Sequence, residues 1–219
     1  MEFFPRVVFI LPLFGINIPV TETVVVTWGI MAGLIIFGYV AGKNFERIPH
    51  GLQNVVEILY EGLEGLIKST MGEGKDGFVP YIGTLAMFLA VANLIGLLTF
   101  RPPTADLSTT LTLAGITFVL SQYEGLKRKG VTGYIKGFFE PLPFMAPLNV
   151  IGQIANPFSM AFRLFGNILG GMIIMGLVYS VVPVLIPASL HFYFDVFAGV
   201  LQTFIFIMLT MTFVTMAAD

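Results

Sequence analysis

Long apolar stretches separated by short charged segments make up most of this chain. A helix needs about 20 mostly apolar residues to cross a hydrocarbon core about 30 Å thick, so each such stretch predicts a membrane-spanning helix. Five helices are predicted in this way, over residues 24–42, 79–100, 107–126, 148–182 and 189–216. The pattern therefore predicts an all-α polytopic membrane protein that forms one membrane domain.

The fourth predicted helix is unusually long. Between Ala146 and Leu190 the only charged residue is Arg163. At about 1.5 Å per residue, a helix over residues 148–182 is about 50 Å long, which exceeds the thickness of the bilayer core. We therefore expect this helix to tilt strongly or to break.

Between the first two predicted spans, apolar and polar residues alternate at helical spacing. This pattern predicts an amphipathic helix over residues 51–71. Its apolar face contains Leu52, Val55, Val56, Leu59, Leu63, Leu66 and Ile67, and its polar face contains Gln53, Asn54, Glu57, Glu61, Glu64 and Lys68. An acidic polar face favours contact with another protein over attraction to anionic lipid. The alternative is a helix at the membrane interface whose charged face is solvated.

Positive charge is distributed unevenly between the two sides of the predicted spans. The segments 43–75 and 127–136 each carry four Lys or Arg residues, whereas the opposite side holds only Arg6 and Arg101. The positive-inside rule places both basic segments in the cytoplasm, with the N-terminus outside and the C-terminus inside. Residues 1–20 have no small-residue cleavage site after their apolar run, so we expect a retained segment outside the first span.

Composition narrows the class of protein further. The chain has 219 residues, of which 56% are hydrophobic and 11% charged, and this excludes a soluble domain. A formal net charge of −2 argues against nucleic acid as a partner, because phosphate binding needs a concentrated basic surface. The chain contains no cysteine, which excludes disulfides and thiolate catalysis, and no pattern predicts a metal site or a cofactor.

Polar residues inside the predicted spans mark the candidate site. A charged side chain at mid-bilayer costs about 2.5–3.5 kcal/mol on insertion scales, and the two that stand out are Arg163 and Asp195. In a helix, the fourth span carries a polar stripe that consists of Asn149, Gln153, Asn156, Ser159, Arg163 and Asn167. On the last span, His191, Asp195 and Gln202 share a face at spacings of four and seven residues.

A row of amides with one guanidinium suits the movement of small ions. Hydrolysis would need paired carboxylates, an activated nucleophile or a metal cluster, and the sequence predicts none of these. A guanidinium stays charged, so Arg163 can force a passing carboxylate to release its ion, while Asp195 beside His191 can exchange ions with a water-filled cavity. Three structural alternatives are a buried Arg163–Asp195 salt bridge, amides that hold helices together, and a His191 that faces water.

Four segments resemble subunit a of F-type ATP synthases. The segment PFSMAFRLFGNILGG (157–171) contains an arginine followed by Leu-Phe-Gly-Asn, as in the signature of that family. Further matches are RPPTADLSTTL (101–111), PLNVIGQIANPFS (147–159) and LQTFIFIMLT (201–210). The resemblance implies a stator subunit of the F0 sector in the lipid bilayer, with a ring of c subunits, the b-subunit peripheral stalk and other ATP synthase subunits as partners.

The resemblance also implies roles for individual residues. Arg163 matches the essential arginine, which faces the ion-carrying carboxylate of the ring and prevents a short circuit between two offset aqueous half-channels. Asn167 and Gln202 match polar residues on the two helices that embrace the ring. Residues 148–182 match the steeply tilted penultimate helix, which forms a hairpin with the last helix.

One departure from the family pattern is informative. Met172 stands where many members carry Glu, and Asp195 stands where many carry His or Gly. These positions are neighbours across the hairpin in the family. We infer that the carboxylate has moved between the helices and that Asp195 lines the outer half-channel.

Two other classes of protein are alternatives to this interpretation. A secondary transporter would show inverted repeats and two broken helices, of which only Asn156-Pro157 resembles a break, and a scaffold subunit would tolerate loss of Arg163. Neither explains the Arg-Leu-Phe-Gly-Asn match. The coupling ion is a proton by default, with sodium as the alternative. The absence of a transit leader favours a bacterial plasma membrane, although organelle-encoded versions would also lack a leader. The absence of a Walker pattern assigns ATP chemistry to other subunits.

Overall fold

The structure is a computed structural model that describes residues 6–13, 16–43, 51–98, 100–139, 142–181 and 189–218. Most of these residues are helical. The α-helices are α1 (Glu22–Gly42), α2 (Leu52–Met71), α3 (Val79–Leu94), α4 (Leu107–Phe138), α5 (Ala146–Val181) and α7 (Ala198–Ala218). Four 3₁₀ turns and one π-helix complete the helical part: η1 (Asp76–Phe78), η2 (Ile95–Leu98), η3 (Pro103–Ala105), η4 (Pro143–Met145) and the π-helix η5 (Phe192–Phe197).

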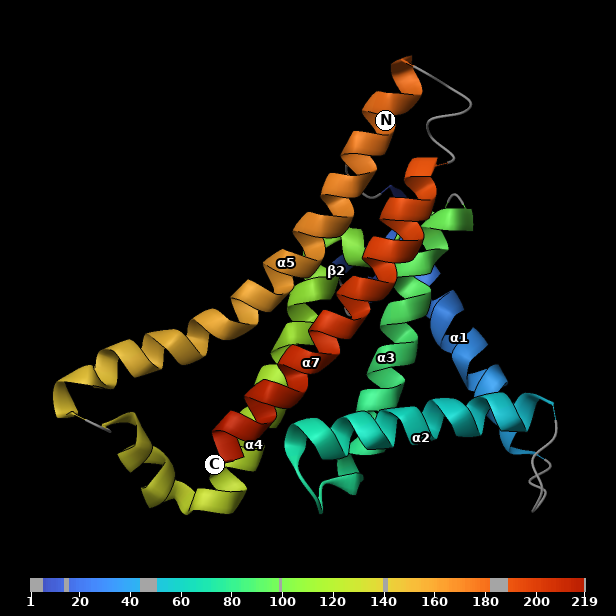
Figure 1. Cartoon of the computed structure of the whole chain (residues 1–219). Coiled ribbons are helices and arrows are strands. Elements are labelled where there is room, and N and C mark those ends of the chain that lie inside the picture. Colours follow the sequence, from blue (N-terminus) through green and yellow to red (C-terminus); the bar gives the residue numbers. More distant parts are fainter. Residues whose placement is uncertain are drawn as a thin grey trace.

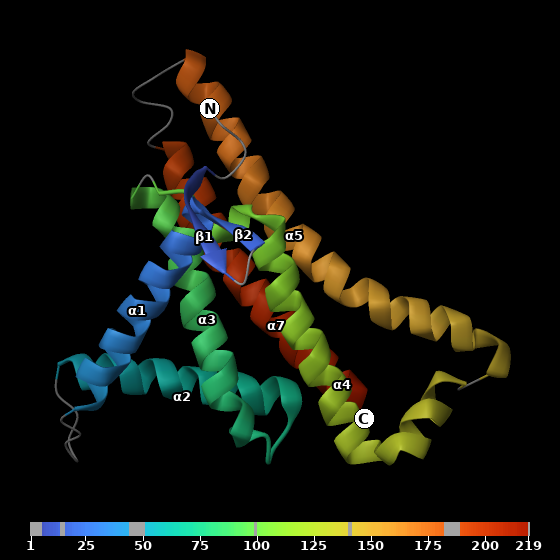
Figure 2. The same cartoon turned by 180° about the vertical axis from the view of Figure 1, so that it is seen from behind.

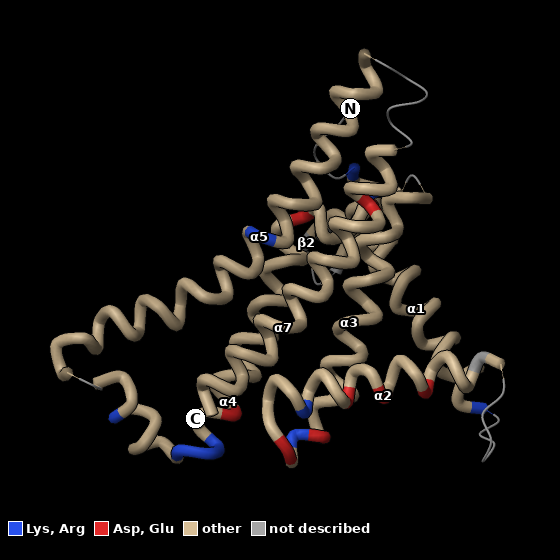
Figure 3. The backbone as a smooth tube through the Cα atoms, viewed as in Figure 1, with Lys and Arg blue, Asp and Glu red and all other residues tan. Residues whose placement is uncertain are grey.

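The helices α3, α4 and α7 form the centre of the molecule (Figures 1 and 2). The helix α2 lies across one end of this bundle, and α1 leans outward beside α3. The charged residues gather mainly at the end that contains α2 and the last part of α4 (Figure 3). The molecule is therefore polar at one end and apolar along its length.

Four helical segments are long and apolar enough to cross a membrane, namely Glu22–Gly42, Asp76–Leu98, Pro143–Val181 and Ser189–Ala218. The remaining predicted span, residues 107–126, lies in α4, which does not meet these criteria among the described helices. The Ser and Thr residues at its start and the charged segment after it lower its mean hydropathy. Gly130 has a φ of 70° inside α4, a conformation that favours glycine, and the helix changes direction there.

The N-terminal segment shows that the all-α prediction is wrong for residues 7–21. The strand β1 (Val7–Leu13) pairs antiparallel with β2 (Ile16–Thr21). Both segments are rich in Val and Ile, whose branched side chains favour strands. The Glu22 N–H donates to the Arg6 carbonyl oxygen over 2.9 Å, so the hairpin leads directly into α1.

The predicted amphipathic helix is confirmed as α2. The second half of α2 packs against α3 and α7 in a buried cluster that comprises Ile67, Met71, Val79, Ile82, Ile207, Met211 and Val214. In its first half, Val55 and Leu59 of the predicted apolar face are each 56% exposed. Only part of the apolar face is therefore covered by this chain.

The helix α5 is continuous over the segment that was expected to tilt or break. Pro157 lies inside it. Proline has no backbone N–H and its ring crowds the preceding turn, which bends a helix. Figures 1 and 2 show this bend: the first part of α5 begins away from the bundle and leads toward it, and the second part runs up beside it.

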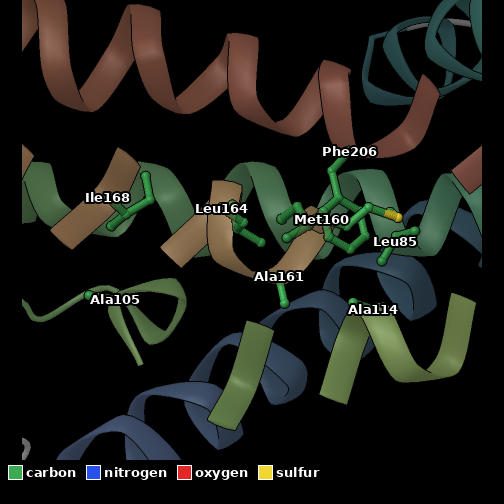
Figure 4. Packing of buried hydrophobic residues seen from close by; sticks show 9 residues of the cluster. Leu85, Ala105, Ala114, Met160, Ala161, Leu164, Ile168 and Phe206 are labelled. Atoms are coloured by element: carbon green, nitrogen blue, oxygen red, sulfur yellow. The ribbon is translucent and has the colours of Figure 1, made fainter. Parts of the chain in front are cut away.

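An apolar core joins α3, α4, α5 and α7. This central apolar cluster comprises Leu85, Leu89, Ala105, Ala114, Met160, Ala161, Leu164, Ile168 and Phe206, most of which Figure 4 shows packed together. Lipid tails are as apolar as these side chains, so in a membrane the cluster stabilises the fold through close packing rather than through removal from water.

Candidate ion-translocation site

Arg163 lies on the outside of the molecule. Its neighbours Ala161 and Leu164 are buried in the central apolar cluster, whereas the Arg163 side chain is exposed. Within the described residues it forms no ion pair. The alternative of a buried salt bridge between Arg163 and Asp195 is therefore wrong, because Asp195 is paired with His191 instead.

One turn further along α5, an amide pair joins this helix to α7. The Asn167 Nδ2 group donates to Gln202 Oε1 over 2.8 Å. Asn167 is exposed, as Arg163 is, while Gln202 is only 3% exposed. The hydrogen bond brings together two of the predicted site residues. It also fixes the axial position of α5 relative to α7 close to Arg163.

A second group of polar side chains lies where α5 ends and the last helix begins. We call Tyr179, His191 and Asp195 the carboxylate cluster. The Tyr179 hydroxyl lies 2.6 Å from His191 Nε2, and His191 Nδ1 is hydrogen-bonded to Asp195 Oδ2. The other carboxylate oxygen, Oδ1, faces Gly96 of η2, where it would lie 3.4 Å from an added Cβ. The sequence predicted the His191–Asp195 contact but not the tyrosine.

Asp195 lies in the π-helix rather than in a regular α-helix. A π-helix carries one surplus residue per wide turn, and such turns are frequent at functional sites. A regular α-helix was predicted here, and the apolar pattern of the sequence does not distinguish the two. Asp195 and Gln202 were expected to share a face. Asp195 is hydrogen-bonded to His191 of its own turn, whereas Gln202 accepts from Asn167 of α5.

A third polar region lies near the other end of α7. A cavity of about 130 Å³ opens between α4, α5 and α7, and we call it the amide cavity. Its polar lining consists of Thr117, Ser121, Gln122, Gln153 and Asn156, and its apolar lining includes Phe213 and Met216 of α7. The sequence predicted the two α5 residues of this lining but missed the three from α4, because their spacing on a single helix gives no information about what they face.

Hydrogen bonds tie the amide cavity to α4. Gln153 Oε1 accepts from Gln122 Nε2 over 3.3 Å and from the Tyr134 hydroxyl over 3.0 Å. Asn149 Nδ2 donates to the Phe138 carbonyl oxygen over 2.8 Å. Through these contacts Gln153 and Asn149 join α5 to α4. Burial raises the pKa of the Tyr134 hydroxyl, and the hydrogen bond to Gln153 lowers it in part.

The remaining stripe residue, Ser159, is exposed like Arg163. The polar stripe of α5 therefore has two environments. Its first half, from Asn149 to Asn156, is covered by α4, and its second half, from Ser159 to Asn167, is turned outward.

A buried hydrogen-bond network between the carboxylate cluster and Gln202 was not predicted. Asn93 Nδ2 donates to the Gly199 carbonyl oxygen over 3.1 Å and to Thr203 Oγ1 over 3.0 Å. Thr104 Oγ1 donates to Asn93 Oδ1 over 2.7 Å. Side-chain amides hydrogen-bonded across helices are a common means of fixing membrane bundles. This network fixes α7 against α3 and η3.

No group of three or more His, Asp or Glu side chains in the described part of the chain could hold a metal ion. The polar groups are instead distributed along α5 and α7 in separate regions. In both helices the residues of the central apolar cluster come between the carboxylate cluster and the amide cavity.

Comparison with known proteins decides the family. The family model described as ATP synthase A chain matches residues 24–215. The chain belongs to the ATP synthase subunit a family. Members of this family are ion-translocating components of the F0 sector and not catalytic subunits, so ATP chemistry does not reside in this chain.

Several curated relatives carry the same name. The chain is 41% identical over 212 residues to "ATP synthase subunit a, sodium ion specific" of Propionigenium modestum, covering 90% of this chain and 73% of the relative. It is 37% identical over 198 residues to ATP synthase subunit a of Moorella thermoacetica, covering 90% of each. The subunit a of Citrifermentans bemidjiense is also 37% identical, over 88% of this chain and 86% of the relative. The resemblance seen in the sequence motifs is confirmed.

Proposed function

We propose that this subunit a passes ions to and from the carboxylates of a c-subunit ring through two offset half-channels, and that Arg163 prevents ions from crossing directly between them. Ion flow is thereby coupled to rotation of the ring and to ATP synthesis in the rest of the complex. Asn167 and Gln202 line the face that meets the ring. Asp195 and His191 serve the outer half-channel, and Gln153 and Asn156 serve the inner one.

The observation that carries this proposal is the exposed, unpaired guanidinium of Arg163. A charged side chain that faced lipid from a membrane helix would cost about 2.5–3.5 kcal/mol or more. Within the part of the chain that the structure describes, no carboxylate offsets this cost. The partner of Arg163 is therefore a carboxylate on another chain, and the ring carboxylate of an ATP synthase supplies it.

The positions of the polar regions support two half-channels. The carboxylate cluster and the amide cavity lie at opposite ends of the α5–α7 pair, with the packed central apolar cluster between them. An ion that enters at one end cannot cross this dry layer inside the subunit. It must travel on the ring, past Arg163, to reach the other end.

The proposed topology has five crossings, with α4 as the third and with α5 and the last helix as a strongly tilted hairpin. The order of contacts supports an antiparallel pair, because Gly171 meets Phe194, Asn167 meets Gln202, and Asn156 shares a cavity with Ala217. The charged end in Figure 3 contains the described basic residues of both segments, and we assign it to the cytoplasm. We place the protein in a bacterial plasma membrane with its N-terminus outside and its C-terminus inside.

Two surfaces serve the proposed partners. The face that carries Arg163 meets the c-subunit ring. On the other side of the molecule, a mostly apolar groove of about 640 Å³ lies between α1, α3 and α4, and it offers the b-subunit peripheral stalk a membrane docking surface. The exposed first half of α2 extends this surface toward the cytoplasm.

A proton is the default coupling ion, and sodium is the second candidate. The observation that favours sodium is the 41% identity to the subunit a of Propionigenium modestum, whose name includes sodium ion specific. The two ions are distinguished by measuring both in the same vesicles.

The test is ATP-driven ion pumping by the whole complex in vesicles, with proton and sodium probes in parallel. We expect Arg163→Ala to abolish pumping while the complex still assembles and hydrolyses ATP. Lys129→Ala is the matched control, because Lys129 is an exposed cation outside the predicted spans, and we expect it to pump normally. Pumping by Arg163→Ala at the wild-type rate would show that the arginine is structural and would remove the basis of the proposal.

A further inference from the structure

We propose that Tyr179 is a positioning residue of the outer ion entry: it holds His191 so that one oxygen of Asp195 is kept free to receive the ion. This inference rests on the proposed function, because it assumes that Asp195 serves the outer half-channel. It adds a residue of α5 that neither the motifs nor the family membership assigns.

The first step of the argument is the geometry of the imidazole. His191 is held at both ring nitrogens, by Tyr179 from α5 at 2.6 Å from Nε2 and by Asp195 from its own turn at Nδ1. The two aromatic rings also lie against each other, with centroids 5.7 Å apart. A side chain with two such contacts cannot turn away from the carboxylate without losing one of them.

The second step concerns where the imidazole proton lies. A carboxylate oxygen has no hydrogen to donate, so the contact between Nδ1 and Asp195 Oδ2 assigns the proton of a neutral imidazole to Nδ1, and Nε2 then accepts from the Tyr179 hydroxyl. The Nδ1–H group then donates to Asp195 Oδ2. The tyrosine hydroxyl thereby favours the tautomer of the neutral histidine that donates to the carboxylate and orients it.

The third step concerns the other carboxylate oxygen. Asp195 Oδ1 faces Gly96 of η2, which has no side chain to compete for it. Around the cluster, α3 contributes no charged side chain. The connection between η2 and η3 contributes the cation Arg101, next to the Pro102 that also packs over Gly96. Arg163 of α5 lies about 24 Å from Tyr179 at 1.5 Å per residue. Asp195 Oδ1 is therefore the atom at which an arriving proton or sodium ion is received.

The neighbourhood provides a matched control. Tyr193 lies in the same π-helix, and its ring stacks on Phe197 with centroids 5.7 Å apart. Its hydroxyl forms no hydrogen bond to any described residue. Tyr193→Phe therefore removes a hydroxyl close to the cluster without touching the His191–Asp195 pair.

The experiment measures ion-driven ATP synthesis by the whole complex in vesicles, as a function of external pH and, in parallel, of external sodium chloride. We expect Tyr179→Phe to raise the half-saturating external ion concentration about three- to tenfold, the effect of one lost hydrogen bond. The maximal rate should stay within about twofold of wild type, because Arg163 and the ring-facing residues are untouched. Tyr193→Phe should leave both quantities unchanged.

A double-variant cycle separates positioning from a purely structural effect. If Tyr179 acts through the imidazole, Tyr179→Phe causes no further change in a His191→Gln background. The inference would be overturned if Tyr179→Phe left the half-saturating concentration unchanged. It would also be overturned if Tyr179→Phe raised that concentration by the same factor in the wild-type and His191→Gln backgrounds. Wild-type ion uptake by Asp195→Asn would instead show that the proposed outer half-channel is wrong, so the two failures give different results.

Discussion

The carboxylate cluster and the amide cavity lie at opposite ends of the same helix pair, and their chemistry differs. The cluster contains a carboxylate, an imidazole and a phenol, each of which changes charge on titration. The polar lining of the cavity consists of hydroxyls and amides, which stay neutral. One end therefore contains a group that can take up a proton or neutralise a cation, while the other offers only neutral oxygen ligands and donors. Under the proposed function, this difference assigns the selective step to the outer entry.

The two regions also differ in how their geometry is fixed. The cluster depends on one tyrosine contact and on a wide turn of the last helix. The cavity is held by several amide contacts between α4 and α5. Single substitutions should therefore have large effects at the cluster and small effects at the cavity.

The largest effect should come from removal of charge at the cluster. We expect Asp195→Asn to reduce ion-driven ATP synthesis about 100-fold, the lower range of the effect of losing a positioned proton-transferring group. ATP hydrolysis by the detached catalytic sector should be unchanged. Asp76→Asn, which alters an exposed carboxylate of η1, is the control and should retain full synthesis. Normal synthesis by Asp195→Asn would remove the chemical difference between the two regions.

A smaller effect should show whether the cluster needs a carboxylate or this particular residue. Gly171 packs on Phe194, where an added Cβ would lie 3.3 Å from Phe194 Cδ1, so α5 passes close to the turn that holds Asp195. We expect Met172→Glu to raise the ATP synthesis of Asp195→Ala about tenfold, because the new carboxylate comes from the facing helix.

The control for this rescue is Ile173→Glu in the same Asp195→Ala background. Residue 173 points about 100° away around the helix and is 37% exposed, so its carboxylate cannot reach the entry. Equal rescue by both variants would show that the added charge acts at a distance. In that case the position of the carboxylate would not define the cluster.

The smallest effect should come from the amide cavity. We expect Asn156→Leu to lower ATP synthesis about threefold, because one of five polar lining residues is lost and the others still hydrate the ion. Ile154→Leu, on an exposed part of the same helix, should have no effect. A loss as large as that of Asp195→Asn would show that the inner end also binds the ion, and that the two regions do not differ in role.

Much of the fold could be predicted from the sequence, because long apolar runs have few alternative structures in a membrane. The helices α1, α2 and α5 begin and end within about two residues of their predicted bounds. The hairpin at Val7–Thr21 was missed, since its apolar residues resemble the start of a span. The π-helix was missed as well, because its extra residue leaves no mark in an already apolar segment.

The candidate site was predictable in its charges but not in its contacts. Arg163 and Asp195 stand out because ionised groups are rare in apolar segments. Their separation, the pairing of Asp195 with His191, and the contribution of Tyr179 depend on how α5 meets the last helix. Gln122 and Asn93 were overlooked for the same reason, since a lone amide in a helix gives no indication of its partner until the neighbouring helix is placed.

The π-helix has a consequence for how such subunits diverge. Its extra residue is absorbed within Phe192–Phe197, and α7 continues regularly from Ala198. A gain or loss of one residue in this turn can therefore change the ion entry while Gln202 keeps its register against Asn167. Under the proposed function, the part of the subunit that meets the external medium can thus change without disturbing the part that meets the rotor.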